Sequence, residues 1–308
     1  MSAGLHPQIR ALVDTGPFAS AETGPRDVEA ERAAYRDLAV ERGGPVEEVA
    51  RVEDMVIPDT GVAARAYWPR EPADELGIVV WLHGGGWYVG DVEAFDRVTR
   101  QIANRSGAVC LSVDYRLAPE HRYPAAVEDA RAAVAWATAL GARQLGADPS
   151  RVVVGGDSAG ANLAIAAART ARERLRAHLL VYPALDPAMA SESYREFADG
   201  PMLTAASMAF CWRTYLDGRV GVDDPDAAPL AADDLAGLPP AYVAVAGHDP
   251  LRDDGIRYAE RLREAGVEVR LERFDDMPHG FIRWGGVVDR AHELIAALGG
   301  FAREAIVR

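Results

Sequence analysis

Residues 151–170 read RVVVGGDSAGANLAIAAART and contain the transition that decides the fold. The run Arg151–Gly155 is apolar without alternation, which is typical of a strand buried on both faces of a parallel sheet. An alanine-rich helical pattern follows from Asn162 to Thr170, and between the two lies the pattern G-x-S-x-G over residues 156–160. A strand, a tight turn and a helix in this order predict a parallel α/β sheet that presents a functional group at the turn.

The alternation of strands and helices extends in both directions from this turn. Apolar runs predict eight strands, at about 50–57, 61–68, 77–83, 107–114, 151–156, 177–182, 240–246 and 267–274. Helical patterns follow the third strand, at roughly 91–105, 123–140, 158–174, 252–265 and 286–306. The sequence therefore predicts a doubly wound α/β domain.

Two segments lie outside this alternation. Residues 1–45 carry two amphipathic helical patterns, one with Leu5, Ile9, Leu12 and Val13 on a face and the other with Val28, Tyr35 and Leu38. Residues 183–240 connect two strands over a length far above the usual 2–6 residues. Within them, Thr204 is a plausible N-cap for a helix through Leu216. This insertion predicts either a helix over the sheet edge or a lid whose apolar face lines a substrate pocket.

Composition excludes several classes of function. The 33 basic and 47 acidic residues give a formal charge of −14, which disfavours nucleic acid and anionic membranes as partners. Every basic residue is an arginine, which excludes Schiff-base and Walker A chemistry. No apolar stretch reaches the roughly 18 residues of a membrane-spanning helix, and no basic region with an apolar core marks a signal peptide. The two cysteines, Cys110 and Cys211, form no disulfide framework, so we expect a cytoplasmic protein.

Ser158 is the candidate nucleophile. At a strand-to-helix turn, small residues two positions on either side permit a strained backbone that presents the serine Oγ above the sheet. The helix N-terminus adds a positive dipole beside a developing oxyanion. The alternative is that Ser158 only caps the helix.

A glycine run follows the third predicted strand, as His83-Gly84-Gly85-Gly86-Trp87. Because glycine lacks Cβ, its backbone can approach a ligand and direct amide N–H groups into a cavity. We predict an oxyanion hole formed by Gly84, Gly85, Gly86 and Ala159. A phosphate-binding loop is the competing function, but no lysine or dinucleotide fingerprint accompanies it. We expect His83 to be structural and to orient this loop through a hydrogen bond.

The serine needs a base, and His279 is the candidate. It lies in the loop Asp275–Phe281 after the last predicted strand, and loops at the carboxyl ends of strands are where such folds place catalytic groups. His178 falls in a buried strand and His292 in the last helix, where both are more easily explained as structural.

The base in turn needs an orienting acid, and Asp249 directly follows the predicted strand Ala241–Ala246. Asp253 and Asp254 fall inside the next helix, where we expect them to cap the helix or face water. No metal site is predicted. The candidate substrate-pocket residues are Trp87, Asp157, Met202, Leu203, Met208, Phe210, Trp212 and Phe281.

These motifs resemble the hormone-sensitive-lipase-like carboxylesterases, the bacterial family IV branch of the α/β-hydrolases, which carry HGGG upstream of GDSAG. The resemblance runs through His83–Gly90, Asp114–Pro124, the Ser158 turn, Asp249–Asp253 and His279–Phe281. It implies an α/β-hydrolase fold with an eight-stranded, mostly parallel sheet. It also implies a helical cap formed by residues 1–45 and 185–225, on a core of residues 46–184 and 226–308.

The same resemblance implies a serine carboxylesterase that hydrolyses short-to-medium-chain acyl esters through Ser158, His279 and Asp249 and an acyl-enzyme. It implies a small-molecule ester substrate, no cofactor, a homodimer through the last strand and helix, and a structural role for Tyr115–Pro124 in bracing the Ser158 turn. Other acyl substrates, such as an amide, a lactone or an aryl formamide, stay open. So does a ligand-binding protein on a hydrolase scaffold, as in the plant gibberellin receptors, although these lack the base histidine present here.

Overall fold

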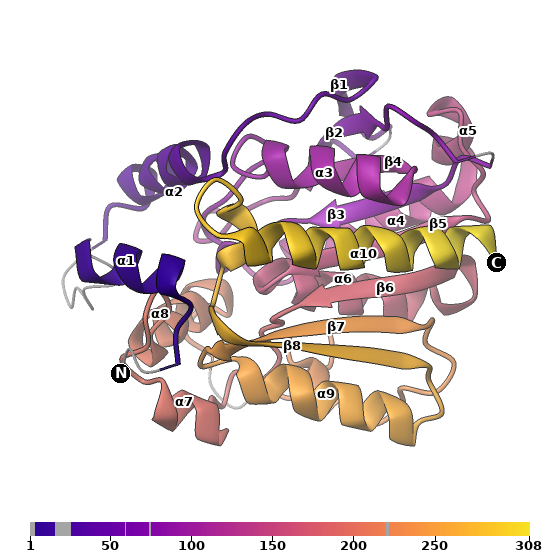
Figure 1. Cartoon of the computed structure of the whole chain (residues 1–308). Helices are drawn as coiled ribbons and strands as arrows, with labels where there is room; N and C mark the ends of the chain where they lie inside the picture. Colours follow the sequence, from indigo (N-terminus) through magenta and orange to yellow (C-terminus); the bar gives the residue numbers. More distant parts are fainter. Residues whose placement is uncertain (1–3, 16–25, 59, 74, 220–221) are drawn as a thin grey trace.

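The computed structural model describes residues 4–15, 26–58, 60–73, 75–219 and 222–308. Its centre is an eight-stranded sheet in the order β1-β2-β4-β3-β5-β6-β7-β8 (Figure 1). The strands are β1 (Arg51–Val56), β2 (Ala63–Trp68), β3 (Ile78–Leu82), β4 (Val109–Asp114), β5 (Val152–Asp157), β6 (Leu175–Val181), β7 (Ala241–His248) and β8 (Val269–Pro278). Only the pairings of β2 with β1 and with β4 are antiparallel, so the predicted eight-stranded, mostly parallel sheet is confirmed.

Strand composition follows position in the sheet. Every residue of β3 and β5 is buried, because helices cover both faces there, and such strands can be apolar throughout. The outermost strand β1 is mostly exposed and is correspondingly polar, as Arg51–Val56 shows. At the opposite edge, no other described strand pairs with the outer side of β8. The dimer expected through the last strand and helix stays a prediction.

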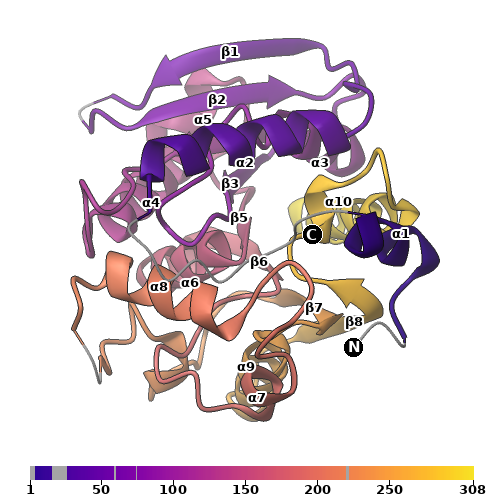
Figure 2. The same cartoon turned by 90° about the vertical axis from the view of Figure 1, so that its left-hand side faces the viewer.

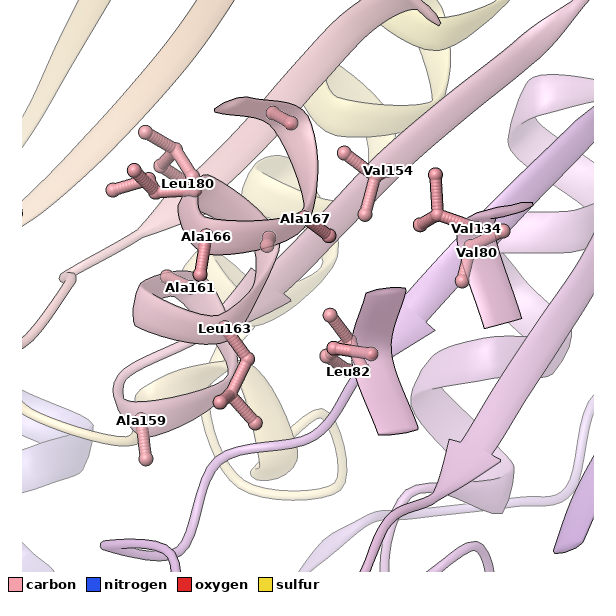
Figure 3. Packing of buried hydrophobic residues seen from close by; sticks show 14 of the residues in the cluster. Val80, Leu82, Val134, Val154, Ala159, Ala161, Leu163, Ala166, Ala167 and Leu180 are labelled. Atoms are coloured by element: carbon pink, nitrogen blue, oxygen red, sulfur yellow. The ribbon is translucent and has the colours of Figure 1, made fainter. Parts of the chain in front are cut away.

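Helices lie on both faces of the sheet. One face carries α3 (Asp96–Ser106) and α10 (Asp289–Val307), and the other carries α4 (Ala125–Trp136), α6 (Ala159–Thr170) and α9 (Arg252–Glu264). Two apolar clusters result, and alternate residues of one strand feed opposite clusters: Val80 and Leu82 join one, Val79 and Trp81 the other. Figure 3 shows the first cluster, with Leu82 and Val154 on the sheet and Leu163 and Ala167 on α6.

The observed helices differ from the predicted ones mainly at their ends. The predicted helix 91–105 begins only at Asp96, because the side chain of Asp91 accepts the Ala94 amide and closes a turn first. The predicted helix 123–140 stops at Trp136 and continues as a π-helical turn, Ala137–Gly141, and the short α5 (Ala142–Gln144), with Ala139 outside helical φ and ψ.

Four further helices gather beside the carboxyl ends of the strands. They are α1 (Pro7–Thr15), α2 (Val28–Arg42), α7 (Glu192–Glu196) and α8 (Ala205–Tyr215), and Figure 2 shows them grouped around that end of the sheet. The predicted cap of α8 is confirmed, since the Thr204 hydroxyl accepts the Ser207 amide at 3.0 Å. None of the described helices is both long enough and apolar enough to cross a membrane.

Candidate active site

Ser158 occupies the turn between β5 and α6 in a strained conformation. Its φ of 54° lies in the left-handed region, where a side chain with Cβ costs energy. Val181 holds the turn by accepting the Ser158 amide at 2.8 Å. A Cβ on Gly160 would overlap the backbone oxygens of Leu82 and His83, so only glycine permits α6 to begin so close to the sheet. The contacts of the closely packed turn therefore offset its strain energy and hold the serine in one position.

His279 links this serine to Asp249. Its Nε2 atom lies 2.9 Å from the Ser158 Oγ, and its Nδ1 atom lies 2.7 Å from Asp249 Oδ2. A carboxylate only accepts hydrogen bonds, so the imidazole proton belongs on Nδ1 and Nε2 is left to accept from the serine hydroxyl. The ring of Tyr182 packs against the imidazole, with 4.5 Å between centroids. The sequence-predicted residues Ser158, His279 and Asp249 thus meet in one continuous hydrogen-bond chain.

Asp249 is fully buried at the end of β7, and both of its oxygens are used. Oδ2 accepts from His279, and Oδ1 accepts the Leu251 amide at 2.9 Å. The rejected candidates point elsewhere: Asp253 Oδ2 accepts the Ser193 amide at 2.8 Å, and Asp254 Oδ2 accepts the Leu185 amide at 3.2 Å. Both bind the segment that precedes or forms α7 and do not contact the imidazole.

The expectation that Asp254 caps its helix or faces water is wrong. The side chain is fully buried, and desolvation raises the pKa of its carboxyl well above the ordinary value. The cause lies in tertiary packing: the chain that leaves β6 through Leu185 passes directly over the first turn of α9 and covers Asp254.

The predicted oxyanion-hole residues divide into two groups. The Gly84 amide donates to Asp157 Oδ1 at 2.8 Å, so it is already engaged. Gly85 and Gly86 line the cavity above Ser158, and their amides donate to no acceptor among the described residues. At both positions φ is positive, and a Cβ would overlap Val89 or Cys211, so the sequence needs glycine there. Ala159 stands in the first turn of α6, next to the serine.

The glycine loop is fixed from behind by buried side chains. His83 Nδ1 lies 2.9 Å from the Gly84 carbonyl oxygen, and the His83 ring stacks on Tyr115 with 4.3 Å between centroids. The Tyr115 hydroxyl donates to the His83 carbonyl at 2.7 Å. Tyr115 therefore braces the glycine loop, and the expected bracing of the Ser158 turn stays a prediction. His83 has the structural place expected of it.

Asp157 is a buried acid next to the nucleophile. Burial raises its pKa to about 6, with Arg283, the Gly84 amide and the Tyr182 hydroxyl acting in the opposite direction. In an unfolded chain the same carboxyl titrates near 4. Between about pH 4 and 6 the folded protein therefore holds a proton that the unfolded chain releases, and the free energy of unfolding falls as the pH rises through this window.

Asp157→Asn should remove this pH dependence, because the amide does not titrate. Between about pH 4 and 7 the wild type should lose about 3 kcal/mol of unfolding free energy that the variant retains. Urea denaturation of both proteins at the two pH values measures the difference. The same loss in both proteins would assign the pH dependence to other groups.

A cavity of about 360 Å³ opens over Ser158 and His279. Four of the eight predicted pocket residues line it, namely Asp157, Met202, Leu203 and Met208. The other four do not. Trp87 turns away from the cavity to stack on Tyr215, with centroids 4.4 Å apart. Trp212 packs against that same Trp87 ring at 4.4 Å.

Phe281 and Phe210 also lie off the cavity wall, for separate reasons. Phe281 is fully buried against Phe274 and Tyr182, where it supports the turn that carries His279. Phe210 packs between the Arg26 guanidinium, 4.4 Å away, and the edge of the Tyr88 ring. These residues are predicted from their aromatic character. That character does not distinguish a residue that lines the cavity from one that packs behind the cavity wall.

Sequence reasoning missed several wall residues. Tyr35 and Leu38 reach the cavity from α2, and Arg283 and Trp284 reach it from the turn after His279. A signal existed for the first two, because Tyr35 and Leu38 share the apolar face of their predicted helix. The remaining missed residues are Arg26, Tyr88, Val89, Ser207, Cys211 and Gly280.

Hydrogen bonds fasten the surrounding helices to the core. From α2, Arg32 donates to the carbonyl oxygens of Tyr88 and Ala118, at 2.8 and 2.9 Å, and pairs with Glu120. From α7, the Ser193 hydroxyl donates to the Pro250 carbonyl at 2.6 Å and accepts the Asp253 amide at 3.2 Å. The walls of the cavity are thus tied to the loops that carry the site.

Known proteins match this chain over most of its length. A family model described as an alpha/beta hydrolase fold matches residues 79–283. The esterase LipI of Mycobacterium tuberculosis is 42% identical over 300 residues, which cover 94% of this chain and 91% of LipI. The carboxylesterase NlhH of the same species is 39% identical over 302 residues, or 94% of this chain and 92% of NlhH. The hyperthermophilic esterase of the archaeon Pyrobaculum calidifontis superposes with a TM-score of 0.90 at 36% identity, covering 99% of each chain.

Proposed function

This chain belongs to the hormone-sensitive-lipase-like branch of the alpha/beta-hydrolase family and is a carboxylic-ester hydrolase, and we propose that Ser158, His279 and Asp249 perform its reaction. One observation carries the proposal: the three side chains form a single hydrogen-bond chain that opens into a cavity. A nucleophile, a base and an orienting acid in this order are the requirements of serine acyl transfer.

The proposed cycle begins when the Ser158 Oγ attacks the ester carbonyl carbon and His279 Nε2 takes the hydroxyl proton. The carbonyl oxygen becomes an oxyanion, held by the amides of Gly85, Gly86 and Ala159. Gly84 is left out of this set because Asp157 already accepts its amide. His279 then returns the proton to the leaving alcohol, and an acyl-serine remains.

Water completes the cycle by the same route. His279 takes a proton from the water as its oxygen attacks the acyl carbon, and the proton returns to the Ser158 oxygen as the carboxylic acid leaves. Asp249 keeps the imidazole in the required tautomer throughout. Every group needed is a side chain or amide of this chain, and the cycle calls on no cofactor.

Labelling with a fluorophosphonate tests the nucleophile assignment. We expect one phosphonyl group per chain, located at Ser158 by mass spectrometry of the digested protein, with loss of ester hydrolysis in proportion to labelling. Labelling at another residue, or full labelling with full activity, would refute the proposal. Rates of hydrolysis measured on matched esters, amides, lactones and aryl formamides then show which of these acyl compounds the enzyme prefers.

The cavity should set the acyl length. Each acyl CH₂ that fits between walls such as Met208 and Leu38 gains up to about 0.8 kcal/mol, whereas chains that overfill the cavity lose roughly 1–3 kcal/mol by overpacking. The volume of about 360 Å³ is small among ligand sites. A short optimum follows for kcat/KM on 4-nitrophenyl esters, and the family resemblance implies a peak at about four to eight carbons with a sharp fall by about sixteen.

A pair of variants on α2 checks that the wall sets this length. Leu38→Trp places a larger side chain on the wall, which makes the cavity smaller and should shift the optimum to shorter acyl chains. Val40, two residues on, is 42% exposed and does not line the cavity, so Val40→Trp should keep the wild-type profile. A wild-type preference for sixteen-carbon esters, or identical profiles in both variants, would show that this cavity does not select the acyl chain.

A further inference from the structure

The active-site cavity contains a cationic group that the proposed cycle does not use. Arg283 ends the 3₁₀ turn Phe281–Arg283 and lines the cavity together with His279 and Gly280. The side chain is only 8% exposed. Its Nε and Nη1 atoms are buried and have no hydrogen-bond partner among the described residues, and no carboxylate there pairs with it. A buried guanidinium without such partners is costly, which calls for an explanation.

Aromatic rings hold this guanidinium in a defined orientation. Its Cζ lies 3.9 Å from the centroid of the Tyr35 ring and 6.0 Å from that of Phe95. The Nη2 atom lies 3.8 Å from the position that a Cβ would take on Gly280. Stacking of this kind fixes the guanidinium by its faces. Because Nε and Nη1 are buried, Nη2, the nitrogen next to Gly280 on the cavity wall, is the one left to donate to a ligand.

The acid that interacts electrostatically with Arg283 does not supply those acceptors. Burial raises the pKa of Asp157 and the positive charge of Arg283 acts to lower it, but the two side chains form no hydrogen bond. Asp157 Oδ1 accepts from the Gly84 amide, and Oδ2 accepts from the Tyr182 hydroxyl. The other arginine on the cavity wall, Arg26, contrasts with Arg283, because it pairs with Glu31 at 3.2 Å. Of these two arginines, only Arg283 has buried guanidinium nitrogens without a hydrogen-bond partner among the described residues.

We propose that Arg283 forms a subsite for a carboxylate on the substrate, so that the enzyme prefers esters whose acyl or alcohol part carries a carboxylate. The Nη2 group of a guanidinium held by stacking can donate charge-assisted hydrogen bonds to a carboxylate. The subsite deepens the proposed function and rests on it. The net charge of −14 repels anions at long range, so such a preference would have to arise locally, at this residue.

Three esters of one size test the proposal and distinguish the two sides of the ester. Ethyl butanoate is the neutral reference. Monoethyl succinate replaces the acyl methyl group with a carboxylate, and carboxymethyl butanoate does the same on the alcohol side. Hydrolysis is followed by pH-stat for the wild type, for Arg283→Met and for the control Arg270→Met. Arg270 also stacks on an aromatic ring, that of Phe301 at 5.1 Å, but lies outside the cavity.

We expect the kcat/KM of one carboxylate ester, relative to ethyl butanoate, to fall at least tenfold in Arg283→Met and less than twofold in Arg270→Met. The ester that responds shows which side of the substrate faces Arg283. If ethyl butanoate is hydrolysed but neither ratio changes in Arg283→Met, the subsite is refuted and the proposed function stands. If the wild type hydrolyses none of the three esters, both proposals fail.

A measurement on the wild type alone covers the case in which Arg283→Met does not fold. Succinate is compared with butanoate for the acyl side, and glycolate with ethanol for the alcohol side, as competitive inhibitors of ethyl butanoate hydrolysis. A carboxylate subsite requires the compound with the additional carboxylate to inhibit at a concentration at least tenfold lower than its partner in one of the two pairs. Equal inhibition constants within both pairs would overturn the proposal.

Discussion

Ser158→Ala should lower kcat on 4-nitrophenyl butanoate by roughly 10⁴–10⁶-fold and leave the fold unchanged. The substitution removes the oxygen that attacks the ester, whereas the Cβ and the strained turn remain. Oxyanion stabilisation and substrate binding do not need the hydroxyl, so a small residual rate over the uncatalysed reaction should persist. Steady-state kinetics measure the loss, and thermal unfolding checks the fold.

Ser207→Ala provides the matched control for this prediction. Ser207 also lines the cavity, but its hydroxyl accepts from Thr204 at 3.0 Å and does not contact His279. We expect its kcat to change by no more than a few-fold. A Ser158→Ala protein that keeps more than a tenth of the wild-type rate, or two variants with equal losses, would mean that another residue is the nucleophile.

The second large effect is expected at Asp249→Asn, which should reduce kcat by about 10⁴-fold. The Leu251 amide donates to Asp249 Oδ1, so the oxygen of the new amide should stay at that position and turn its NH₂ group toward His279 Nδ1. The imidazole would then accept at Nδ1 and carry its proton on Nε2. In that tautomer it cannot take the proton of Ser158.

Asp253→Asn is the control, because it changes a neighbouring acid in the same way. Asp253 binds Ser193 and Arg252 and does not contact the imidazole, so its loss should lower kcat only mildly. Kinetics of both variants at saturating ester make the comparison. Equal losses, or a larger loss at Asp253, would refute the assignment of Asp249 as the orienting acid.

The sequence predicts the central strands of the sheet well because they are buried on both faces. Residues such as Ile78–Leu82 must be apolar throughout to occupy the middle of the sheet. An apolar run of five residues is typical of a buried strand and is shorter than a buried helix. The serine, histidine and acid are also predictable, because the chain order in this fold and the position of loops after strands restrict the choice. That Ser158, His279 and Asp249 meet is a property of the structure, whereas their chemical roles stay a proposal.

The pocket is harder to predict because its walls come from elements that are distant in sequence. Trp87 belongs to the glycine motif, yet its positive φ turns the ring toward Tyr215 and away from the cavity. Arg283 has no motif of its own, and only the packing of α2 places Tyr35 against it. The engagement of the Gly84 amide by Asp157 likewise depends on how two loops meet across the sheet.

The contact between α7 and α9 limits how far residues 185–225 can be exchanged without the loop that follows Asp249. Ser193 binds Asp253 through two backbone amides and binds the carbonyl oxygen of Pro250, the residue directly after Asp249. Ser193 is therefore bound to the residue directly after Asp249. In a chimera that takes residues 185–225 from a relative, residue 193 and the loop 249–254 should come from the same parent. If they come from different parents, the contacts that position Asp249 change even where Ser158, His279 and Asp249 are all kept.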